Sequence, residues 1–494
     1  MTVAAAVVRF LYPAAGPISA LQRIRSVPRF DWATAARFNR RKGDVMKAQL
    51  GRVTFLLATA LTVSAVFVSA CGSSKEEAGG GQGASPGDTT GVTDTEIRIG
   101  TLLPISGNPA AAWGISLSKS MQAYFDYIND QGGVYGRKIK LFVGDSQYSG
   151  PVASEAIRKL VEQDKIFLLE GSLGTEAHTA VYKYLEERGI PDIYILTGNS
   201  KWTVPVARNR FTSLMDYTTE GRVFAKYVFE NFDGKKLGIL AQNDDYGKEG
   251  ETGMREGLKE LNADVNVTVE YYDATQSDVT AQVQRLRGAG VDIVAFWGTP
   301  VVGAAMMKTA RETLSWDVPF MINSANALEV VARLAGYDNI EGTVSAVIGV
   351  QSYELDNLAI AEKKEILAKY APDTVFDNTA LGGYVIAQGI VGYLKQTGPN
   401  LTREAFLDTV ESLCEYMCDT CLVPASTSST DHRLVDAEVL AKAVVDRSTD
   451  PPTFRWEPFG DPIDFEGTRD CTVPTPPPGA EDQPGPPVNA EMKK

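Results

Sequence analysis

From Glu96 onward, short apolar runs alternate with longer stretches in which apolar residues recur at helical spacing. Runs of the first kind are typical of buried strands, and stretches of the second kind are typical of amphipathic helices. The predicted strands are Glu96–Leu103, Lys138–Gly144, Ile166–Leu169, Asp192–Leu196, Lys236–Leu240, Val265–Tyr271, Asp292–Trp297 and Pro319–Ile322. The alternation predicts an α/β fold with parallel sheets, and because it restarts at Thr219 we predict two doubly wound lobes.

The helices are expected between and after these strands. They are predicted at Trp113–Asn129, Ser154–Gln163, Glu176–Arg188, Thr219–Asn231, Lys248–Leu261, Val279–Ala289, Val301–Thr313, Ala359–Tyr370, Thr379–Lys395 and Thr402–Ser412. In the first helix, the positions expected to face inward are Ile115, Met121, Phe125 and Ile128. Glycines inside the Thr379–Lys395 helix, at Gly382, Gly383 and Gly389, predict close packing against another helix.

An uncharged apolar stretch, Val53–Ala70, precedes the alternating part of the chain. It follows Lys47 and Arg52 and ends in small residues, which is typical of an export signal. The segment Val68–Cys71 looks like a bacterial lipobox, in which Cys71 is diacylated and becomes the new N-terminus. The alternative is an uncleaved membrane anchor, because eighteen apolar residues can just span a bilayer. We predict residues 1–45 as an unassigned extension, 46–70 as a lipoprotein signal, 71–93 as a Gly/Ser-rich tether and 471–494 as a Pro-rich tail.

Charge and histidine content exclude two classes of function. The chain has 494 residues and a net charge of −14; residues 1–70 carry +8, so the remaining residues carry −22. A surface this acidic repels nucleic acid. With only His178 and His432, a multi-histidine metal centre is not expected. His178 lies in a predicted helix at what we interpret as a surface position, and His432 is expected to cap or pair locally.

Lipidation of Cys71 would leave four cysteines, Cys414, Cys418, Cys421 and Cys471. An even number in an exported protein predicts two disulfides, and the sequence does not choose among the three possible pairings. The first three could instead belong to a thiolate metal site. Their spacing is irregular and the compartment outside the membrane is oxidising, so we predict disulfides and no metal.

Five loops after predicted strands carry small, hydroxylic, amide and aromatic side chains. They are Gly171–Thr175, Thr197–Trp202, Gln242–Gly247, Gly298–Pro300 and Asn323–Ser324. In an open parallel sheet, ligands bind outside the carboxyl ends of the strands, so the loops predict a site for a small organic ligand. Each residue alone is explained by capping or turn formation, and only the convergence of the five loops supports a site. Because nucleophile-elbow, phosphate-loop and dinucleotide motifs are missing, we predict no enzyme activity and no cofactor.

The motifs resemble the periplasmic leucine/isoleucine/valine-type binding proteins, over roughly residues 94–466. The resemblance rests on Ile99–Gly107, Asn129–Arg137, Leu196–Trp202 and Asn243–Gly247. Members of this family are solute receptors of ABC importers, with two lobes that are joined by three crossover segments and close on the ligand. The resemblance implies lobe 1 at 94–214 plus 350–424 and lobe 2 at 215–349 plus 425–470. The crossovers are then expected near Phe211–Tyr217, Thr343–Gln351 and Leu422–Thr430.

The resemblance also implies a binding cleft. Trp113 corresponds to an aromatic position of the first loop. Thr175 and the segment Thr197–Asn199, which includes Thr197 and Asn199, correspond to the positions that hold a ligand carboxylate in lobe 1. Tyr246 corresponds to an aromatic position of lobe 2, and Thr299 aligns beside it more loosely.

One departure from the family pattern affects the ligand. Amino-acid binders of this family carry an acid directly after the strand that here ends at Ile322. This chain has Asn323-Ser324-Ala325 at that place, and we predict Asn323 as a further ligand-binding residue. A buried ammonium without a paired charge costs several kcal/mol. A branched-chain amino acid therefore requires another acid, such as Asp216 or Asp244.

The competing ligand is a carboxylate or amide without the amine. Its ring would be held by the aromatic residues Trp113, Trp202 and Tyr246. We expect a monomer on the outer face of the cytoplasmic membrane, with a lipid anchor, a small-molecule ligand, ABC permease subunits as partners, and no nucleic acid. The alternatives are a ligand sensor of the same fold that signals through a separate membrane partner, and an exported hydrolase, which the missing nucleophile motif disfavours.

Overall fold

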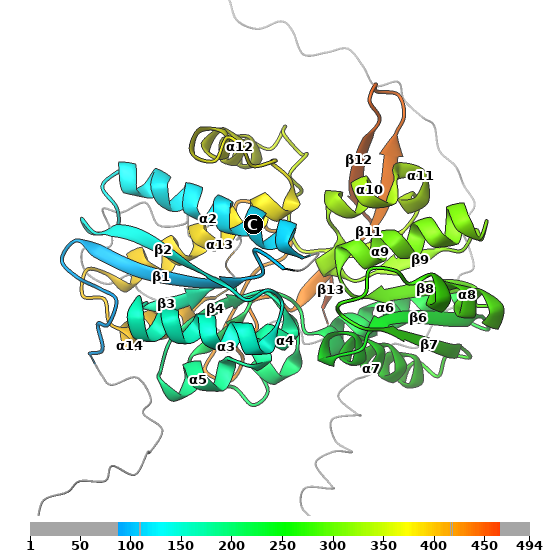
Figure 1. Cartoon of the computed structure of the whole chain (residues 1–494), viewed down its shortest axis with the longest axis horizontal. Coiled ribbons are helices and arrows are strands. Elements are labelled where there is room, and N and C mark those ends of the chain that lie inside the picture. Colours follow the sequence, from blue (N-terminus) through cyan, green and yellow to red (C-terminus); the bar gives the residue numbers. More distant parts are fainter. Residues whose placement is uncertain (1–86, 108–109, 415, 417, 465–494) are drawn as a thin grey trace, which may run out of the picture. The chain divides into compact units, whose positions relative to one another are not determined.

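The computed structural model describes residues 87–107, 110–414, 416 and 418–464, and its strands form two sheets (Figure 1). The first sheet has the order β2-β1-β3-β4-β5 and is parallel throughout. Its strands are β1 (Glu96–Leu103), β2 (Lys138–Asp145), β3 (Leu168–Glu170), β4 (Asp192–Ile195) and β5 (Arg210–Thr212). We call this sheet and its helices lobe 1.

Helices cover both faces of the lobe 1 sheet, as the alternating sequence pattern predicts. One face packs on α2 (Ala111–Asp130) and α13 (Asn378–Thr397), with α12 (Leu358–Tyr370) and α14 (Arg403–Glu411) beside them. The other packs on α3 (Gly150–Arg158), which continues as the π-helix Lys159–Gln163, and on α4 (Thr175–Thr179) and α5 (Tyr182–Glu187). The single helix predicted over Glu176–Arg188 is therefore wrong, because the chain breaks between α4 and α5.

The predicted inward face of α2 needs one correction. Met121, Phe125 and Ile128 are buried, but Ile115 is 39% exposed and Leu117 is buried instead. Six residues along an α-helix correspond to a rotation of about 600°, which places Ile115 about 120° away from Met121. Leu117 is one turn from Met121 and therefore shares its face.

The second sheet, which we call lobe 2 together with its helices, has the order β12-β11-β10-β9-β8-β6-β7. Its strands are β6 (Lys236–Gln242), β7 (Asn266–Tyr272), β8 (Ile293–Trp297), β9 (Phe320–Ile322), β10 (Val344–Val347), β11 (Ala437–Asp446) and β12 (Thr453–Pro458), and β13 (Ile463–Asp464) pairs with β11. The expectation of a wholly parallel sheet is wrong here, because β11 is antiparallel to both β10 and β12. A hairpin such as β11–β12 needs no crossover helix, so the helix-strand alternation did not reveal it.

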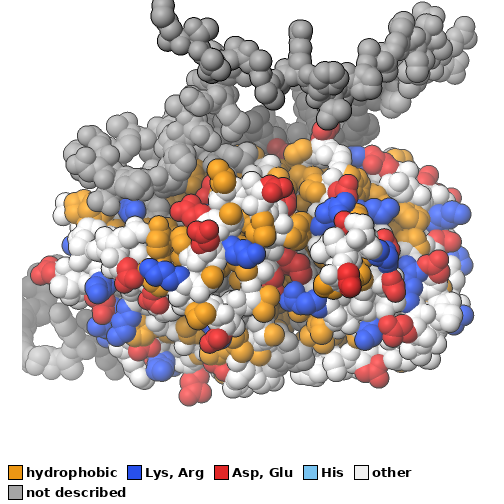
Figure 2. Space-filling model, turned by 90° about the horizontal axis from the view of Figure 1, so that it is seen from above, with side chains coloured by type: hydrophobic (Ala, Val, Ile, Leu, Met, Phe, Trp, Pro, Cys, Tyr) orange, Lys and Arg blue, Asp and Glu red, His pale blue; other side chains and the backbone are white. Residues whose placement is uncertain are grey.

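Lobe 2 is also layered, with helices on both faces of its sheet. One face packs on α6 (Tyr217–Phe232) and α7 (Asp245–Glu260). The other packs on α8 (Thr280–Ala289), α9 (Pro300–Lys308) and α10 (Glu329–Ala335), with α11 (Tyr337–Ile340) beside them. On the face shown in Figure 2, acidic and basic side chains are interspersed.

The chain passes between the two lobes three times, as residues 213–216, 348–357 and 412–436. Backbone hydrogen bonds join these crossovers to one another and to β5. Thr212 N–H donates to His432 O at 3.1 Å, and Leu434 N–H donates to Thr212 O at 3.0 Å. Val350 N–H donates to Thr420 O at 2.8 Å, so the second and third crossovers are also paired. The predicted two-lobe fold with three crossovers is confirmed.

Close packing explains one of the glycines in α13. A Cβ on Gly383 would lie 2.2 Å from Ser120 Oγ and 2.7 Å from Leu117 O, so the helix pair α2–α13 requires glycine there. Gly389 instead approaches the hydroxyl of Tyr194 on β4, and Gly382 has open space beside it.

None of the described helices is long and apolar enough to cross a membrane. The predicted leader, Cys71, most of the tether and the tail with Cys471 lie outside the described residues.

Glu170 is a fully buried carboxyl at the end of β3. Neither of its carboxylate oxygens has a hydrogen-bond partner among the described residues. Burial raises the pKa of Glu170 well above its ordinary value of 4.5. The native protein therefore keeps this proton at pH values where the unfolded chain has lost it.

This burial makes stability depend on pH, and Glu170→Gln should remove part of that dependence. Above the ordinary pKa the unfolded state binds fewer protons than the native state, so the free energy of unfolding falls as pH rises. The fall from this one group is at most about 1.4 kcal/mol per pH unit. In urea titrations, we expect the stability of Glu170→Gln relative to wild type to increase from pH 5 to pH 8. Exposed Glu187→Gln controls for the loss of one negative charge, and an equal decline in Glu170→Gln and wild type would contradict the prediction.

Candidate functional site

A cavity of about 330 Å³ lies between the lobes and is lined by residues from both lobes and from the crossovers. Trp113 and Leu117 of α2 and Ile386 of α13 border it in lobe 1. Tyr246 of α7 and Leu328 border it in lobe 2. The crossovers add mainly apolar side chains, namely Leu214, Ile348, Val350, Leu413, Val423, Leu434 and Val435. The cavity wall is therefore predominantly hydrocarbon, which suits an apolar ligand.

One part of the wall is polar and is built from tyrosine and threonine hydroxyls. Thr175 Oγ1 lies 2.6 Å from Thr197 Oγ1, and Thr197 Oγ1 lies 3.3 Å from the hydroxyl of Tyr217. The rings of Tyr217 and Tyr246 pack with centroids 4.6 Å apart. Burial raises the pKa values of Tyr148, Tyr217 and Tyr246. These hydroxyls consequently stay protonated at neutral pH.

The predicted site residues fall into two layers. Trp113, Thr175 and Tyr246 line the cavity. The other four predicted site residues are buried but do not line the cavity, and we call them the outer layer: Thr197, Asn199, Thr299 and Asn323.

Each residue of the outer layer has a structural partner. Thr197 contacts Thr175, and Asn323 Oδ1 accepts a hydrogen bond of 2.9 Å from the hydroxyl of Tyr246. Asn199 accepts a hydrogen bond from Lys201 N–H, and Thr299 N–H donates to the hydroxyl of Tyr272. The predicted loops thus meet at one place, with part of their polar groups used to position the residues that line the cavity.

Neither acid suggested for an ammonium partner lines the cavity. Asp216 caps α6 by accepting from Thr219 N–H at 2.8 Å, and its carboxylate is 3.3 Å from Arg433. Asp244 caps α7 by accepting from the N–H groups of Tyr246 and Gly247. Both carboxylates are therefore committed to helix N-termini.

Among the described residues, Glu438 is the carboxyl group that does line the cavity, and it was not predicted from the sequence. It is the second residue of β11, between Ala437 and a run of apolar residues. An acid inside an apolar strand was the available signal, but β11 itself was not predicted. Tyr148, Tyr194 and Tyr217 are further lining residues that were not singled out.

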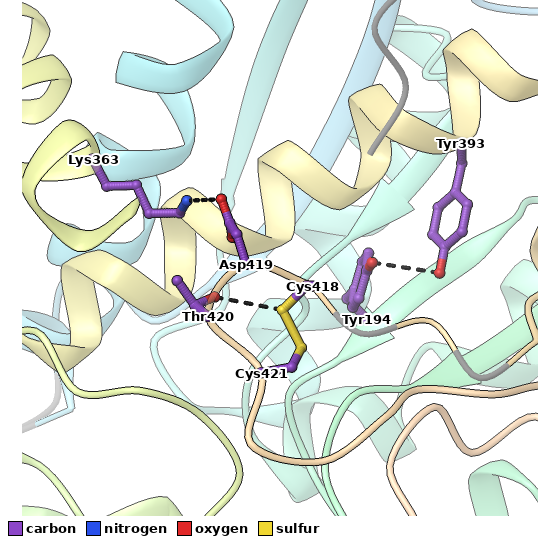
Figure 3. The surroundings of a disulfide bond; sticks show 7 residues. All are labelled: Tyr194, Lys363, Tyr393, Cys418, Asp419, Thr420 and Cys421. Atoms are coloured by element: carbon purple, nitrogen blue, oxygen red, sulfur yellow. Dashed lines mark hydrogen bonds and ion pairs between the residues drawn. A yellow bond between two sulfur atoms is a disulfide. The ribbon is translucent and has the colours of Figure 1, made fainter. Parts of the chain in front are cut away.

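The third crossover closes the cavity with a loop that contains a disulfide. Cys418 and Cys421 are bonded to each other and both line the cavity, together with Thr420 and Tyr194 (Figure 3). Cys414 is disulfide-bonded as well. The loop is also tied to α12, because the buried ammonium of Lys363 lies 2.6 Å from the carboxylate of Asp419.

His178 is buried, and the interpretation of a surface position is wrong. It is 1% exposed and its ring packs edge-on against Trp202, with centroids 4.5 Å apart. Its Nδ1 lies 2.8 Å from Ser172 Oγ, and its Nε2 lies 3.1 Å from Asp192 Oδ2. Polar groups after β3 and on β4 thus lie against both ring nitrogens inside lobe 1. Ser172 and Trp202 lie outside the cavity lining, so this cluster supports the loops rather than contacting a ligand.

Polar contacts hold the two lobes together around the cavity. Lys201 Nζ lies 2.7 Å from Asp245 Oδ2, between the loop after β4 and α7. Arg333 of α10 lies 3.0 Å from Asp377, which caps α13. Both contacts join one lobe to the other, so they stabilise the arrangement in which the cavity has walls on both sides.

Comparisons with known proteins agree with this architecture. The family model described as periplasmic binding protein matches residues 96–448. Leu/Ile/Val-binding protein homolog 1 of Brucella suis biovar 1 is 24% identical over 313 residues, which are 63% of this chain and 81% of that protein.

Solved structures show the same fold at low sequence identity. A branched chain amino acid ABC transporter from Thermus thermophilus with bound valine has a TM-score of 0.67 and 18% identity, covering 76% of this chain and 98% of that chain. A fatty acid ABC transporter substrate-binding protein from Thermomonospora curvata has a TM-score of 0.66 and 21% identity, covering 76% and 95%. The family match spans most of the chain and includes both lobes, which confirms the resemblance seen in the sequence. The chain belongs to the periplasmic binding protein family.

Proposed function

We propose that this protein is the extracytoplasmic solute-binding component of an ABC importer, which captures an apolar organic solute between its lobes and delivers it to a membrane permease. The observation that carries the proposal is the cavity of about 330 Å³ walled by both lobes and by the crossovers. A ligand there contacts lobe 2 fully only when the lobes are closed. Binding therefore favours the closed state, which a permease can distinguish from the open one. The solute leaves chemically unchanged.

The composition of the cavity wall favours a solute with a large apolar body over a polar metabolite. The volume of the cavity falls within the usual range of about 300–1,000 Å³ for small-molecule sites. Apolar side chains line most of it, and the polar groups gather near Thr175, Tyr217 and Tyr246. The Brucella suis relative is named for leucine, isoleucine and valine, and the Thermomonospora curvata protein for a fatty acid. Both names describe solutes with a hydrocarbon body, which is consistent with the proposal.

We further propose that Cys71 carries a lipid and that the tether after it holds the two lobes at the outer face of the cytoplasmic membrane. The support is the sequence pattern of a basic segment, an apolar stretch and the segment Val68–Cys71. Family membership supports a location outside the cytoplasmic membrane. Mass spectrometry of the membrane fraction, before and after Cys71→Ala, tests the anchor directly.

Filling the cavity should weaken ligand binding without weakening the fold. Gly382 of α13 borders the cavity, and a Cβ there would meet no atom within 4 Å. We expect Gly382→Leu to reduce ligand affinity at least about tenfold, since leucine occupies the space of the solute. Leucine forms helix better than glycine by about 1 kcal/mol, so the free energy of unfolding should not fall.

The measurement is a screen of small organic compounds for those that raise the melting temperature of the wild-type protein, followed by calorimetric titration of both proteins. Gly288→Leu is the matched control, because Gly288 lies on the exposed side of α8 and also has open space beside it. If Gly382→Leu and wild type bound the ligand with equal affinity, the ligand would have to bind outside this cavity. A wild-type protein that no compound stabilises would overturn the proposed function.

The disulfide loop should matter more for binding than for folding. The bond between Cys418 and Cys421 closes a very short loop, with a sequence separation of 3, and loop-closure entropy is small for short loops. In the double variant Cys418→Ser/Cys421→Ser, the loop that forms this part of the cavity wall is no longer held by the disulfide. We expect affinity to fall several-fold, with a change in melting temperature of only a few degrees.

Calorimetric titration and thermal unfolding of the same preparations check this prediction. Asp419→Asn serves as the control, because it weakens the contact with Lys363 and keeps the disulfide. If Asp419→Asn lowers affinity as much as the double substitution does, the disulfide has no specific part in shaping the wall.

A further inference from the structure

Among the described residues that line the predominantly apolar cavity, Glu438 supplies the carboxyl group. It is 1% exposed, and its Oε2 has no hydrogen-bond partner in the described part of the chain. Lysine and arginine are missing from the described residues that line the cavity. A buried carboxyl oxygen without a hydrogen-bond partner is costly, so its position in the wall of a cavity points to a partner that a ligand supplies.

A second carboxyl lies next to it, on a different element. Glu220 of α6 is fully buried and accepts a hydrogen bond from Ser324 N–H through Oε1. Its Oε2 also has no partner in the part of the chain that the structure describes. Ser324 lines the cavity, and its side chain lowers the pKa values of both Glu220 and Glu438. The serine therefore stands between the two carboxyls at the edge of the cavity.

The pair cannot hold two negative charges at neutral pH. Burial raises the pKa of Glu438 well above its usual range, and the charge of Glu220 raises it further. Burial likewise raises the pKa of Glu220 to about 7. The nearby charge of Asp216 raises the pKa values of both Glu220 and Glu438. The guanidinium of Arg433 forms ion pairs with Asp216 and Asp431. This end of the cavity therefore attracts a proton, a cation or a hydrogen-bond donor.

We propose that Glu438, with Ser324 beside it, receives the hydrogen-bond-donating head of an otherwise apolar ligand, an amine or an alcohol. The inference rests on the proposed function, because it names the ligand class of the same cavity. A donor head satisfies the unpartnered Oε2, and an ammonium also neutralises the charge of the pair. The apolar body then packs against Val347 and Ile348 and across to Ile386 on α13. A carboxylate head in this place would add a negative charge beside a pair of buried carboxyls that already disfavours charge, and the described residues that line the cavity offer it no lysine or arginine.

A matched series of probes tests the proposal on the wild-type protein. Octylamine, 1-octanol and octanoate share one hydrocarbon body and differ in the head, and each is titrated calorimetrically at pH 7. We expect octylamine or octanol to bind at least tenfold more tightly than octanoate. The tighter of the two identifies the head as cationic or neutral. Octanoate binding as tightly as either donor probe, or more tightly, overturns the inference.

Substitution of the carboxyl checks that Glu438 is the cause. We expect Glu438→Gln to reduce the preference for the donor probe over octanoate to less than about threefold, since the amide can also donate to a carboxylate. Glu170→Gln is the matched control, because it removes a buried carboxyl in lobe 1 that does not line the cavity. A preference that survives in Glu438→Gln, with folding verified by circular dichroism, overturns the inference. If Glu438→Gln does not fold, the probe series on the wild-type protein decides alone.

Two further ligands distinguish a failure of the donor-head inference from a failure of the proposed solute-binding function. Leucine and phenylacetate are titrated in the same experiment. If either of them binds and the octyl probes do not, the donor-head inference is wrong while the solute-binding function stands. If no compound in a broad panel binds or raises the melting temperature, both are wrong.

Discussion

Backbone hydrogen bonds between the crossovers are the constraint on which the binding site depends. Each lobe has its own sheet and its own core, and the cavity described above takes its walls from both lobes and from the crossovers. The bond between Val350 and Thr420 holds the second and third crossovers side by side, and the bond between Thr212 and Leu434 ties the third crossover to β5. This paired connection fixes which strand ends face each other, and it also supplies a large part of the cavity wall. A site built on a connection between lobes is coupled to their opening and closing.

The polar groups of the site are organised in two layers with different tasks. The layer facing the cavity includes Thr175, Tyr246 and Glu438, whereas Thr197 and Asn323 orient their neighbours from behind. Rigid support of this kind keeps donors and acceptors fixed before a ligand arrives, which reduces the entropy lost on binding. The acids that the sequence suggested, Asp216 and Asp244, have the further task of capping α6 and α7. Consequently the carboxyl group that borders the cavity comes from β11 instead.

Much of the fold could be predicted because its signals are local. Hydrophobic periodicity reflects which side of a helix or strand is buried, so β1 to β4 and most helices were predicted close to their observed bounds, whereas the three-residue strand β5 was not predicted. The mistakes occurred where burial depends on distant partners. Glu176–Arg188 was predicted as one helix because its break is not marked by glycine or proline, and His178 was placed on the surface because Ser172, Trp202 and Asp192 approach it only in the folded lobe. The hairpin of β11 and β12 was missed because its pairing partner, β10, lies about ninety residues earlier in the chain.

The sequence by itself determined the two-lobed α/β architecture, the family, and the convergence of five polar loops at the ends of the strands. These follow from local patterning and from the rule that parallel strands end at one edge of a sheet. Only the tertiary structure decided which loop residues face the cavity and which stand behind it, since a polar side chain in a loop can cap a helix or face the ligand with the same local sequence. It alone brought Glu220 and Glu438, more than two hundred residues apart, to the same buried place beside Ser324. Long-range packing sets that proximity, and no local pattern encodes it.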